Sequence, residues 1–142
     1  MLQPKPGWMM AILLVVAGLA GDTSAAGAEQ GHGTVIVARH WHGRTPTAKA
    51  DEYEKYLASA ITKFPSIPGN LGYEMMRETV GEITHFSVIS YWESRQAIHA
   101  YAGDDIAKTR NLPRDAEYLI EPEPTVRNYD LLVDARKTAA KR

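Results

Sequence analysis

Hydrophobic and polar residues alternate along four stretches of the chain and recur every three or four residues along two others. Alternation with many β-branched and aromatic residues predicts strands, and the wider spacing predicts amphipathic helices. Helices are expected over residues 45–63 and 94–103. Strands are expected over residues 34–41, 71–79, 83–92 and 125–133.

Short sequence signals mark the ends of the two predicted helices. Thr45 is expected to cap the first helix, with Pro46 at its first position. Ser94 is expected to cap the second helix, and Gly103 to end it. Asp104 then predicts a cap for a further short turn, and the proline-rich stretch that follows, residues 112–124, is expected to be irregular.

The predicted order strand, helix, strand, strand, helix, strand is that of a ferredoxin-like α+β domain over residues 34–133. Two right-handed crossovers give a four-stranded antiparallel sheet with both helices on one face. The other face would be bare and rich in large apolar groups, so we expect a homodimer formed through this open sheet face. Residues 134–142 are expected to form a polar C-terminal tail.

Residues 1–28 have the features of a signal peptide. The apolar run Trp8–Ala20 is shorter than the roughly 20 residues that a membrane-spanning helix needs. Ala26 and Ala28 satisfy the small-x-small rule, so cleavage is expected after Ala28, with residues 29–33 as a flexible tail. The protein would then be periplasmic or secreted, without a membrane anchor. An uncleaved anchor and a buried hydrophobic helix are the alternatives.

Composition excludes several kinds of chemistry. The chain has 16 Lys and Arg residues against 17 Asp and Glu residues, a net charge of -1, so no basic surface for nucleic acid is expected. Cysteine is absent, which excludes disulfides, thiolate metal sites, iron–sulfur clusters and cysteine nucleophiles.

Four short segments carry a resemblance to a known family. They are Arg39-His40-Trp41-His42-Gly43, Pro68-Gly69-Asn70-x-Gly72, Ser90-Tyr91-Trp92-Glu93-Ser94 and Ala97-Ile98-x-Ala100-Tyr101-Ala102-Gly103. Together they resemble the antibiotic biosynthesis monooxygenase (ABM) superfamily of dimeric α+β barrels. This resemblance implies one of several activities: cofactor-independent oxygenation of aromatic polyketides, quinol-type oxygenation or haem degradation. The fold hosts all of them, so it does not fix the function.

The haem-degrading branch of that superfamily uses an Asn on the first strand, a Trp in the second helix and a His about ten residues later. In this chain the corresponding positions hold Tyr101 and Asn111, and the first predicted strand contains no Asn. Since an Asn amide hardly ligates iron, haem degradation is the less expected activity, unless His99 or His40 substitutes. No cofactor is expected.

Two histidines, His40 and His42, lie two residues apart on the first predicted strand and therefore share one face. That spacing suits a metal ion, but no third ligand lies nearby in sequence, so no metal is expected. His40 is the candidate general base, with packing against the first helix as its alternative role. His42 is a candidate binding residue.

The remaining candidate residues have both structural and functional interpretations. Trp92 is a core aromatic or a wall of a ligand pocket, and Tyr101 is a packing residue or a donor to substrate. Asn111 is a second candidate donor for the oxyanion that develops on the substrate. Arg39 and Arg77 are expected to pair with Glu74, Glu78 or Asp130, or to point at an anionic ligand.

We expect a pocket between the sheet and the helices, open near residues 103–111, with His40, Trp92 and Tyr101 facing it and Asn111 at its edge. Its ligand would be a small apolar or aromatic molecule. One function is cofactor-independent oxygenation of an electron-rich, quinol-type aromatic. The alternative is a non-catalytic small-ligand-binding or stress-related module, which needs the same features.

Overall fold

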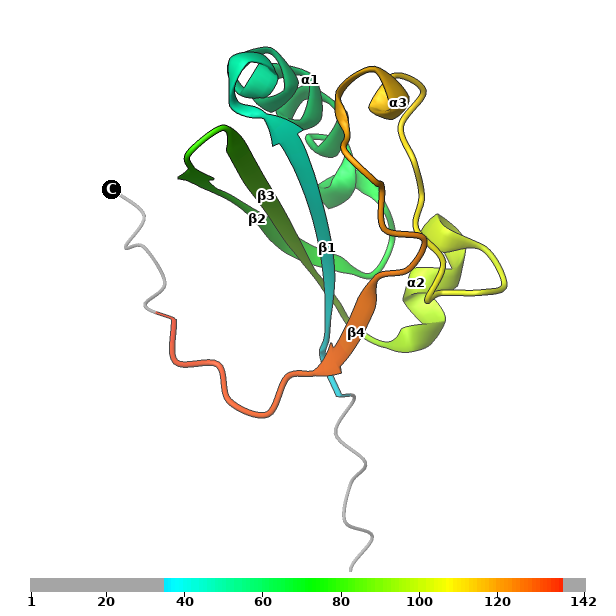
Figure 1. The fold of residues 1–142 in the computed structure, drawn as a ribbon. Coiled ribbons are helices and arrows are strands. Elements are labelled where there is room, and N and C mark those ends of the chain that lie inside the picture. Colours follow the sequence, from blue (N-terminus) through cyan, green and yellow to red (C-terminus); the bar gives the residue numbers. More distant parts are fainter. Residues whose placement is uncertain (1–34, 137–142) are drawn as a thin grey trace, which may run out of the picture. The chain divides into compact units, whose positions relative to one another are not determined.

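A computed structural model describes residues 35–136 of the chain (Figure 1). The predicted signal peptide and the tail that follows it lie outside these residues. None of the helices within residues 35–136 combines the length and the hydropathy needed to cross a membrane. The elements are β1 (Val37–Pro46), α1 (Ala50–Ile61), β2 (Asn70–Val80), β3 (Ile83–Trp92), α2 (Arg95–Ala102), α3 (Asp115–Tyr118) and β4 (Arg127–Asp130), with short 3-10 helices η1 (Thr47–Lys49) and η2 (Phe64–Ser66).

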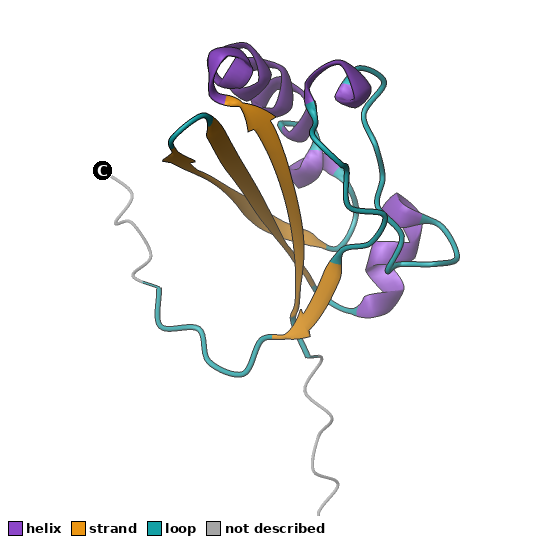
Figure 2. Cartoon of the chain, viewed as in Figure 1, coloured by secondary structure: helices purple, strands orange, loops and turns teal. Residues whose placement is uncertain are grey.

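The four strands form one antiparallel sheet in the order β2-β3-β1-β4. The helices lie on one side of this sheet, and the other side is open (Figures 1 and 2). The prediction of a ferredoxin-like α+β fold is therefore confirmed.

The β2–β3 hairpin follows directly from the sequence. Val80 pairs with Ile83, so Gly81 and Glu82 form a two-residue turn. Gly81 has a positive φ of 59°, which glycine adopts without steric cost. The bounds of β3 are those predicted, because residues between the turn and Ser94 are rich in β-branched and aromatic types.

The start of the first helix differs from the prediction. Thr45 and Pro46 do not cap and open a helix; they are the last two residues of β1, opposite Thr84 and Ile83. β3 offers a partner for β1 along its whole length, so ladder hydrogen bonds extend the strand past the local cap signal. Helix α1 begins only at Ala50.

The segment after α2 also differs from the prediction. Ser94 caps α2 as expected, through the Ala97 N–H, and Gly103 ends it. The turn predicted after Asp104 forms, since the Lys108 N–H donates to the Asp105 carbonyl at 3.2 Å, but Asp105 caps it in place of Asp104: the Asp105 carboxylate accepts from the Ala107 N–H at 2.9 Å.

The C-terminal part of the sheet is shorter than predicted. The stretch expected to be irregular contains the four-residue helix α3, and β4 covers only Arg127–Asp130 instead of residues 125–133. β4 is short because it pairs only with residues 37–40 of β1, at the edge of the sheet.

Two packed clusters hold the helices on the sheet. In the first, Tyr53, Leu57 and Ile61 of α1 pack on Phe86 and Val88 of β3. These three positions of α1 lie on the apolar stripe predicted from the sequence. The second cluster joins α2 to the sheet and consists of Val37, Trp92, Ile98 and Ala102. The two clusters leave the space between α1, α2 and the sheet to be closed by residues 103–124.

Gly69 allows the segment before β2 to approach α2 closely. Its φ is +81°, and a Cβ built there would lie 2.5 Å from the Cβ of Ala97. Its carbonyl accepts from the Glu93 N–H at 2.9 Å. A side chain at this position would therefore be strained by its backbone and would collide with α2.

The open face of the sheet is more polar than predicted. It carries histidines of β1 and β3 and acidic residues of β2, because these alternate with the residues that face the helices. Its large exposed apolar side chains are Met76, Val80 and Tyr129. Large apolar groups are therefore present on the open face, as expected, but they share it with these charged and polar residues.

Candidate functional site

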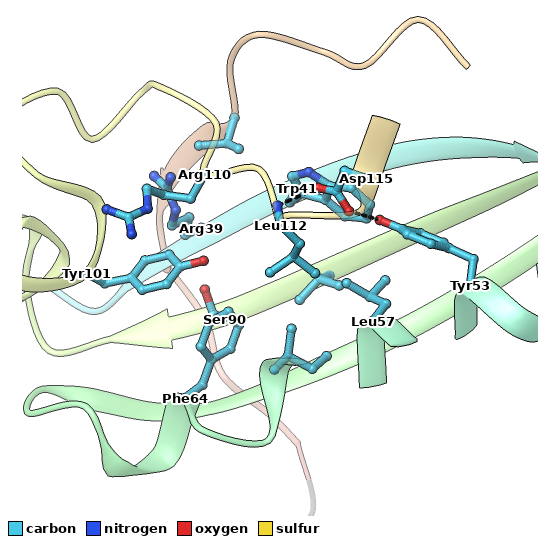
Figure 3. A pocket seen from close by; sticks show the side chains of 13 residues that line it. Arg39, Trp41, Tyr53, Leu57, Phe64, Ser90, Tyr101, Arg110, Leu112 and Asp115 are labelled. Carbon is cyan, nitrogen blue, oxygen red and sulfur yellow. Dashed lines mark hydrogen bonds between the residues drawn. The ribbon is translucent and has the colours of Figure 1, made fainter. Parts of the chain in front are cut away.

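A pocket lies between the sheet and α1, beneath residues 110–115 (Figure 3). Space for water-sized groups inside it amounts to about 50 Å³. It lies between the sheet and the helices, as predicted, but the segment that lines it is residues 110–115, whereas its opening was expected near residues 103–111. The lining residues are Arg39, Trp41, Tyr53, Leu57, Ile61, Phe64, Val88, Ser90, Tyr101, Arg110, Leu112, Asp115 and Val126.

The middle of the pocket is apolar. Leu57 and Phe64 come from the α1 side, Val88 comes from β3, and Leu112 comes from the covering segment. Walls of this kind exclude water and suit a flat or compact apolar molecule.

A carboxylate lies at one end of the pocket. Asp115 is buried, and its two oxygens accept from the Tyr53 hydroxyl at 3.0 Å and from the Leu112 N–H at 2.7 Å. Burial raises the pKa of Asp115, and the two hydrogen bonds only partly oppose this shift. The pKa of Tyr53 is raised by burial and by the neighbouring carboxylate, so the proton they share stays on the tyrosine.

A cationic group, Arg39, lies at the other end. Only 4% of Arg39 is exposed, and its guanidinium donates to the carbonyls of Ile106 and, at 3.0 Å, Lys108. A longer contact of 3.4 Å reaches the side-chain oxygen of Asn128. Burial lowers the pKa of Arg39, but an arginine stays protonated in a protein.

Tyr101 and Arg110 lie beside Arg39 and complete the polar end (Figure 3). Both guanidinium groups approach the Tyr101 ring, at 5.9 Å for Arg39 and 5.7 Å for Arg110. Burial raises the pKa of Tyr101, so its hydroxyl is a proton donor at neutral pH. Among residues 35–136 this hydroxyl has no hydrogen-bond partner, which leaves it available to a ligand.

The structure places the predicted residues Tyr101 and Arg39 in the pocket, whereas Trp92 lies behind it. The Trp92 ring is fully buried and stacks on Tyr101 with ring centroids 5.8 Å apart. Its indole N–H donates to the Ser90 hydroxyl at 2.9 Å. Trp92 therefore supports two lining residues without lining the pocket itself, and the interpretation as a pocket wall is wrong.

Three other predicted residues, His40, His42 and Asn111, do not line the pocket. His40 and His42 lie on the open face of the sheet, because side chains of β1 alternate and Arg39 and Trp41 face the helices. Asn111 is exposed and absent from the lining. The hypothesis that His40 is the base of this pocket is therefore wrong.

The histidines of the open face form a small cluster of their own. His42 lies 2.7 Å from the Glu123 carboxylate through Nδ1, and its Nε2 lies 3.1 Å from Nδ1 of His85. Residues 35–136 contain no group of three or more His, Asp or Glu side chains placed to hold a metal ion.

The expected arginine ion pairs are also different in the structure. Arg77 pairs with Asp51 and Glu54 of α1, because the face of β2 that carries Arg77 is the one that α1 covers. Arg39 forms no ion pair with any carboxylate in the described part of the chain.

Sequence reasoning missed Asp115, Arg110 and Ser90. Ser90 could have been found, since it alternates with Val88 and Trp92 on the same face of β3. Asp115 could not, because its hydrogen bond to Tyr53 joins residues 62 positions apart and no local pattern reports it.

Residues 35–136 form a small ferredoxin-like α+β domain with an apolar-walled pocket between its sheet and its helices. The model of the family named antibiotic biosynthesis monooxygenase matches residues 37–109, about half of the chain. The chain belongs to this family.

Similar proteins include enzymes that act on haem. A "heme oxygenase (mycobilin-producing)" from Mycobacterium tuberculosis is 35% identical over 57 residues, which are 40% of this chain and 53% of that protein. The chain thus spans about half the length of the curated relatives it matches.

Solved structures show the same fold. A protein of unknown function from Nitrosomonas europaea has a TM-score of 0.55 at 17% identity, covering 75% of this chain and 99% of its own. The heme-degrader MhuD from Mycobacterium tuberculosis, with two hemes bound in its active site, has a TM-score of 0.50 at 24% identity. That match covers 71% of this chain and 99% of MhuD.

Proposed function

We propose that the protein is a cofactor-independent monooxygenase of small, electron-rich hydroxylated aromatics. The observation that carries this proposal is the pocket's layout: apolar walls with a carboxylate of raised pKa at one end and cationic and hydroxyl donors at the other. An aromatic ring with oxygen substituents at opposite ends fits this layout. The family membership agrees with the proposal.

In this mechanism Asp115, and not His40, is the general base. Its carboxylate accepts the proton of a substrate hydroxyl, and its raised pKa makes it a stronger base than an exposed aspartate. Arg39, Arg110 and the Tyr101 hydroxyl stabilise negative charge on the other side of the ring.

The deprotonated ring then reacts with O₂ directly. For a hydroquinone the sum balances as hydroquinone plus O₂ giving hydroxyquinone plus water. One oxygen atom forms a bond to a ring carbon and loses its bond to the second, which leaves as water. The substrate supplies all four electrons, so no separate reductant is needed.

Haem degradation, the activity named for the relative, is less well supported by the pocket. No histidine of residues 35–136 lines it: His40, His42 and His85 are on the open face, and His99 is half-buried, with Nδ1 2.8 Å from the carbonyl of Gly103. The position expected for an iron-binding histidine holds no imidazole. The residues present therefore do not fit haem as substrate.

A non-catalytic binding module is the second candidate. Both oxygens of Asp115 already accept hydrogen bonds, from Tyr53 and Leu112, which would also be the arrangement of a carboxylate that only fastens the covering segment to α1. Such a protein would bind an aromatic ligand and leave it unchanged.

Oxygen uptake separates the two candidates. With hydroquinone, catechol and 2,5-dihydroxybenzoate as substrates, we expect the protein to raise O₂ consumption above autoxidation, with one ¹⁸O atom from ¹⁸O₂ in the product. Heat-denatured protein serves as the control. Binding of these compounds without any added O₂ consumption would reject the oxygenase and support the binding module.

We also propose that two copies pair through the open sheet face. Met76, Val80 and Tyr129 are exposed there, and Leu132 and Val133 follow at the end of the described chain. Burying these groups would stabilise a dimer without touching the pocket, which lies on the other side of the sheet.

Export through the signal peptide predicted for residues 1–28 stays a prediction.

Light scattering tests the proposed dimer. We expect twice the protomer mass at micromolar concentration, since a standard interface of roughly 800 Å² per partner holds at that concentration. Met76→Glu should shift the protein to monomer, because it places a charge on the open face. Ser59→Glu, on the exposed side of α1, should leave the dimer intact. A monomeric wild type, or a dimer unaffected by Met76→Glu, would contradict the proposal.

A further inference from the structure

Arg39 is a buried cation whose charge is not balanced by the protein around it. Only 4% of the Arg39 surface is exposed to solvent. Its protein partners are two backbone carbonyls and one amide oxygen, all uncharged. Among residues 35–136 no carboxylate lies within ion-pair distance of it, and Asp105 raises the pKa of Arg39 less than burial lowers it. A buried charge without an opposite charge is costly.

A second positive charge, Arg110, lies beside Arg39. Arg110 is close enough to lower the pKa of Arg39 further, and both guanidinium groups approach the ring of Tyr101. Arg110 has no ion pair or hydrogen bond within the described part of the chain. Two cations and a free hydroxyl thus converge on one end of the pocket (Figure 3).

The donors of Arg39 are not all used. A guanidinium carries five N–H groups, and the carbonyls and the amide take at most three of those of Arg39. The remaining N–H groups, the Arg110 guanidinium and the Tyr101 hydroxyl match the acceptors of a planar anion such as a carboxylate.

We propose that this end of the pocket binds an anionic group, and that the ligand is therefore an aromatic acid rather than a neutral quinol. The carboxylate of the ligand pairs with Arg39 and Arg110 and accepts from Tyr101, while its ring lies against the apolar walls. This inference rests on the proposed function only in assigning the aromatic ring to the same pocket; the anion site itself needs no catalysis.

A matched pair of ligands tests the anion site without reference to turnover. The affinities of 2,5-dihydroxybenzoate and its methyl ester, which have the same ring and hydroxyls, are measured by calorimetry without oxygen. We expect the acid to bind about ten- to a hundredfold more tightly, the range of charge-assisted hydrogen bonds. Arg110→Gln should reduce this preference at least several-fold, and so should Arg39→Gln.

Two controls keep the result interpretable. Arg127→Gln removes an equal charge from the open face and should leave the preference unchanged. Arg39→Gln removes bonds to two carbonyls, so its melting temperature is recorded. If that variant fails to fold, Arg110→Gln, whose side chain is exposed and makes no described hydrogen bond, decides the question.

The outcomes separate the anion site from the oxygenase. Equal affinities for acid and ester, no binding of either, or a preference unchanged in the arginine variants would overturn the anion site. Hydroquinone turnover alongside such a result would leave the oxygenase standing. Arginine-dependent binding of the acid with no oxygen uptake would keep the anion site and reject the oxygenase.

Discussion

Asp115→Asn should lower the rate of oxygen uptake about a hundredfold, the lower end of what a positioned general base contributes. An amide cannot take a proton from a phenolic hydroxyl at neutral pH. It can still accept from the Leu112 N–H and interact with the Tyr53 hydroxyl, so the covering segment should stay in place. Oxygen-electrode kinetics of both proteins at saturating substrate measure the effect.

The pH dependence gives an independent check of this role. Burial raises the pKa of Asp115, so kcat/KM should fall as the pH decreases through a value above the ordinary aspartate pKa. Because folded Asp115 holds its proton more tightly than unfolded Asp115, its contribution to folding stability is present at low pH and is lost as the pH rises through the raised pKa. Titration of Asp115 therefore does not itself unfold the protein on the acidic side, where activity is lost.

The variant Tyr53→Phe tests whether Asp115 causes the pH dependence of kcat/KM. The Tyr53 hydroxyl donates to the Asp115 carboxylate and lowers its pKa, so its removal should move the acidic limb to higher pH while activity at high pH survives. Asp115→Asn with wild-type activity, or an acidic limb unmoved in Tyr53→Phe, would show that Asp115 is not the base.

Trp92→Ala should lower the free energy of unfolding by about 3–5 kcal/mol, the usual cost of truncating a large buried aromatic. The Trp92 side chain is fully buried, where it packs on Phe64, Tyr101 and Ile98. Truncation would leave a cavity beneath α2 and remove the support of the Tyr101 ring. Urea unfolding followed by circular dichroism measures the change.

Trp92→Phe separates packing from hydrogen bonding. It keeps an aromatic ring against Tyr101 but loses the N–H that donates to Ser90, so a smaller loss of roughly 1–2 kcal/mol is expected. An unfolding free energy for Trp92→Ala within 1 kcal/mol of wild type would show that α2 packs without this ring.

The fold was predictable because its signals are local and repeated. The β3 bounds followed from a run of β-branched and aromatic residues, and the start of α2 followed from the Ser94 cap. The start of α1 was not predictable in this way. At Thr45 and Pro46 the local cap signal competes with pairing to β3, and the pairing partner lies about 40 residues away in sequence.

The candidate site was less predictable than the fold, since it depends on which face of each strand the helices cover. Alternation grouped Arg39 with Trp41 and His40 with His42 correctly, but it could not assign either pair to the helix side. Asp115 and Arg110 come from a segment without periodicity, whose path over the sheet is set by distant contacts such as Asp115 with Tyr53.

The alternation of β1 has a consequence for how the protein can be altered. Arg39 and Trp41 contribute to the pocket, while His40 and His42, their neighbours in sequence, contribute only to the opposite surface. In the proposed function, ligand selectivity and self-association would therefore depend on separate positions of one strand. Substitutions at residues 39 and 41 would alter the pocket, whereas substitutions at residues 40 and 42 would alter the open sheet face.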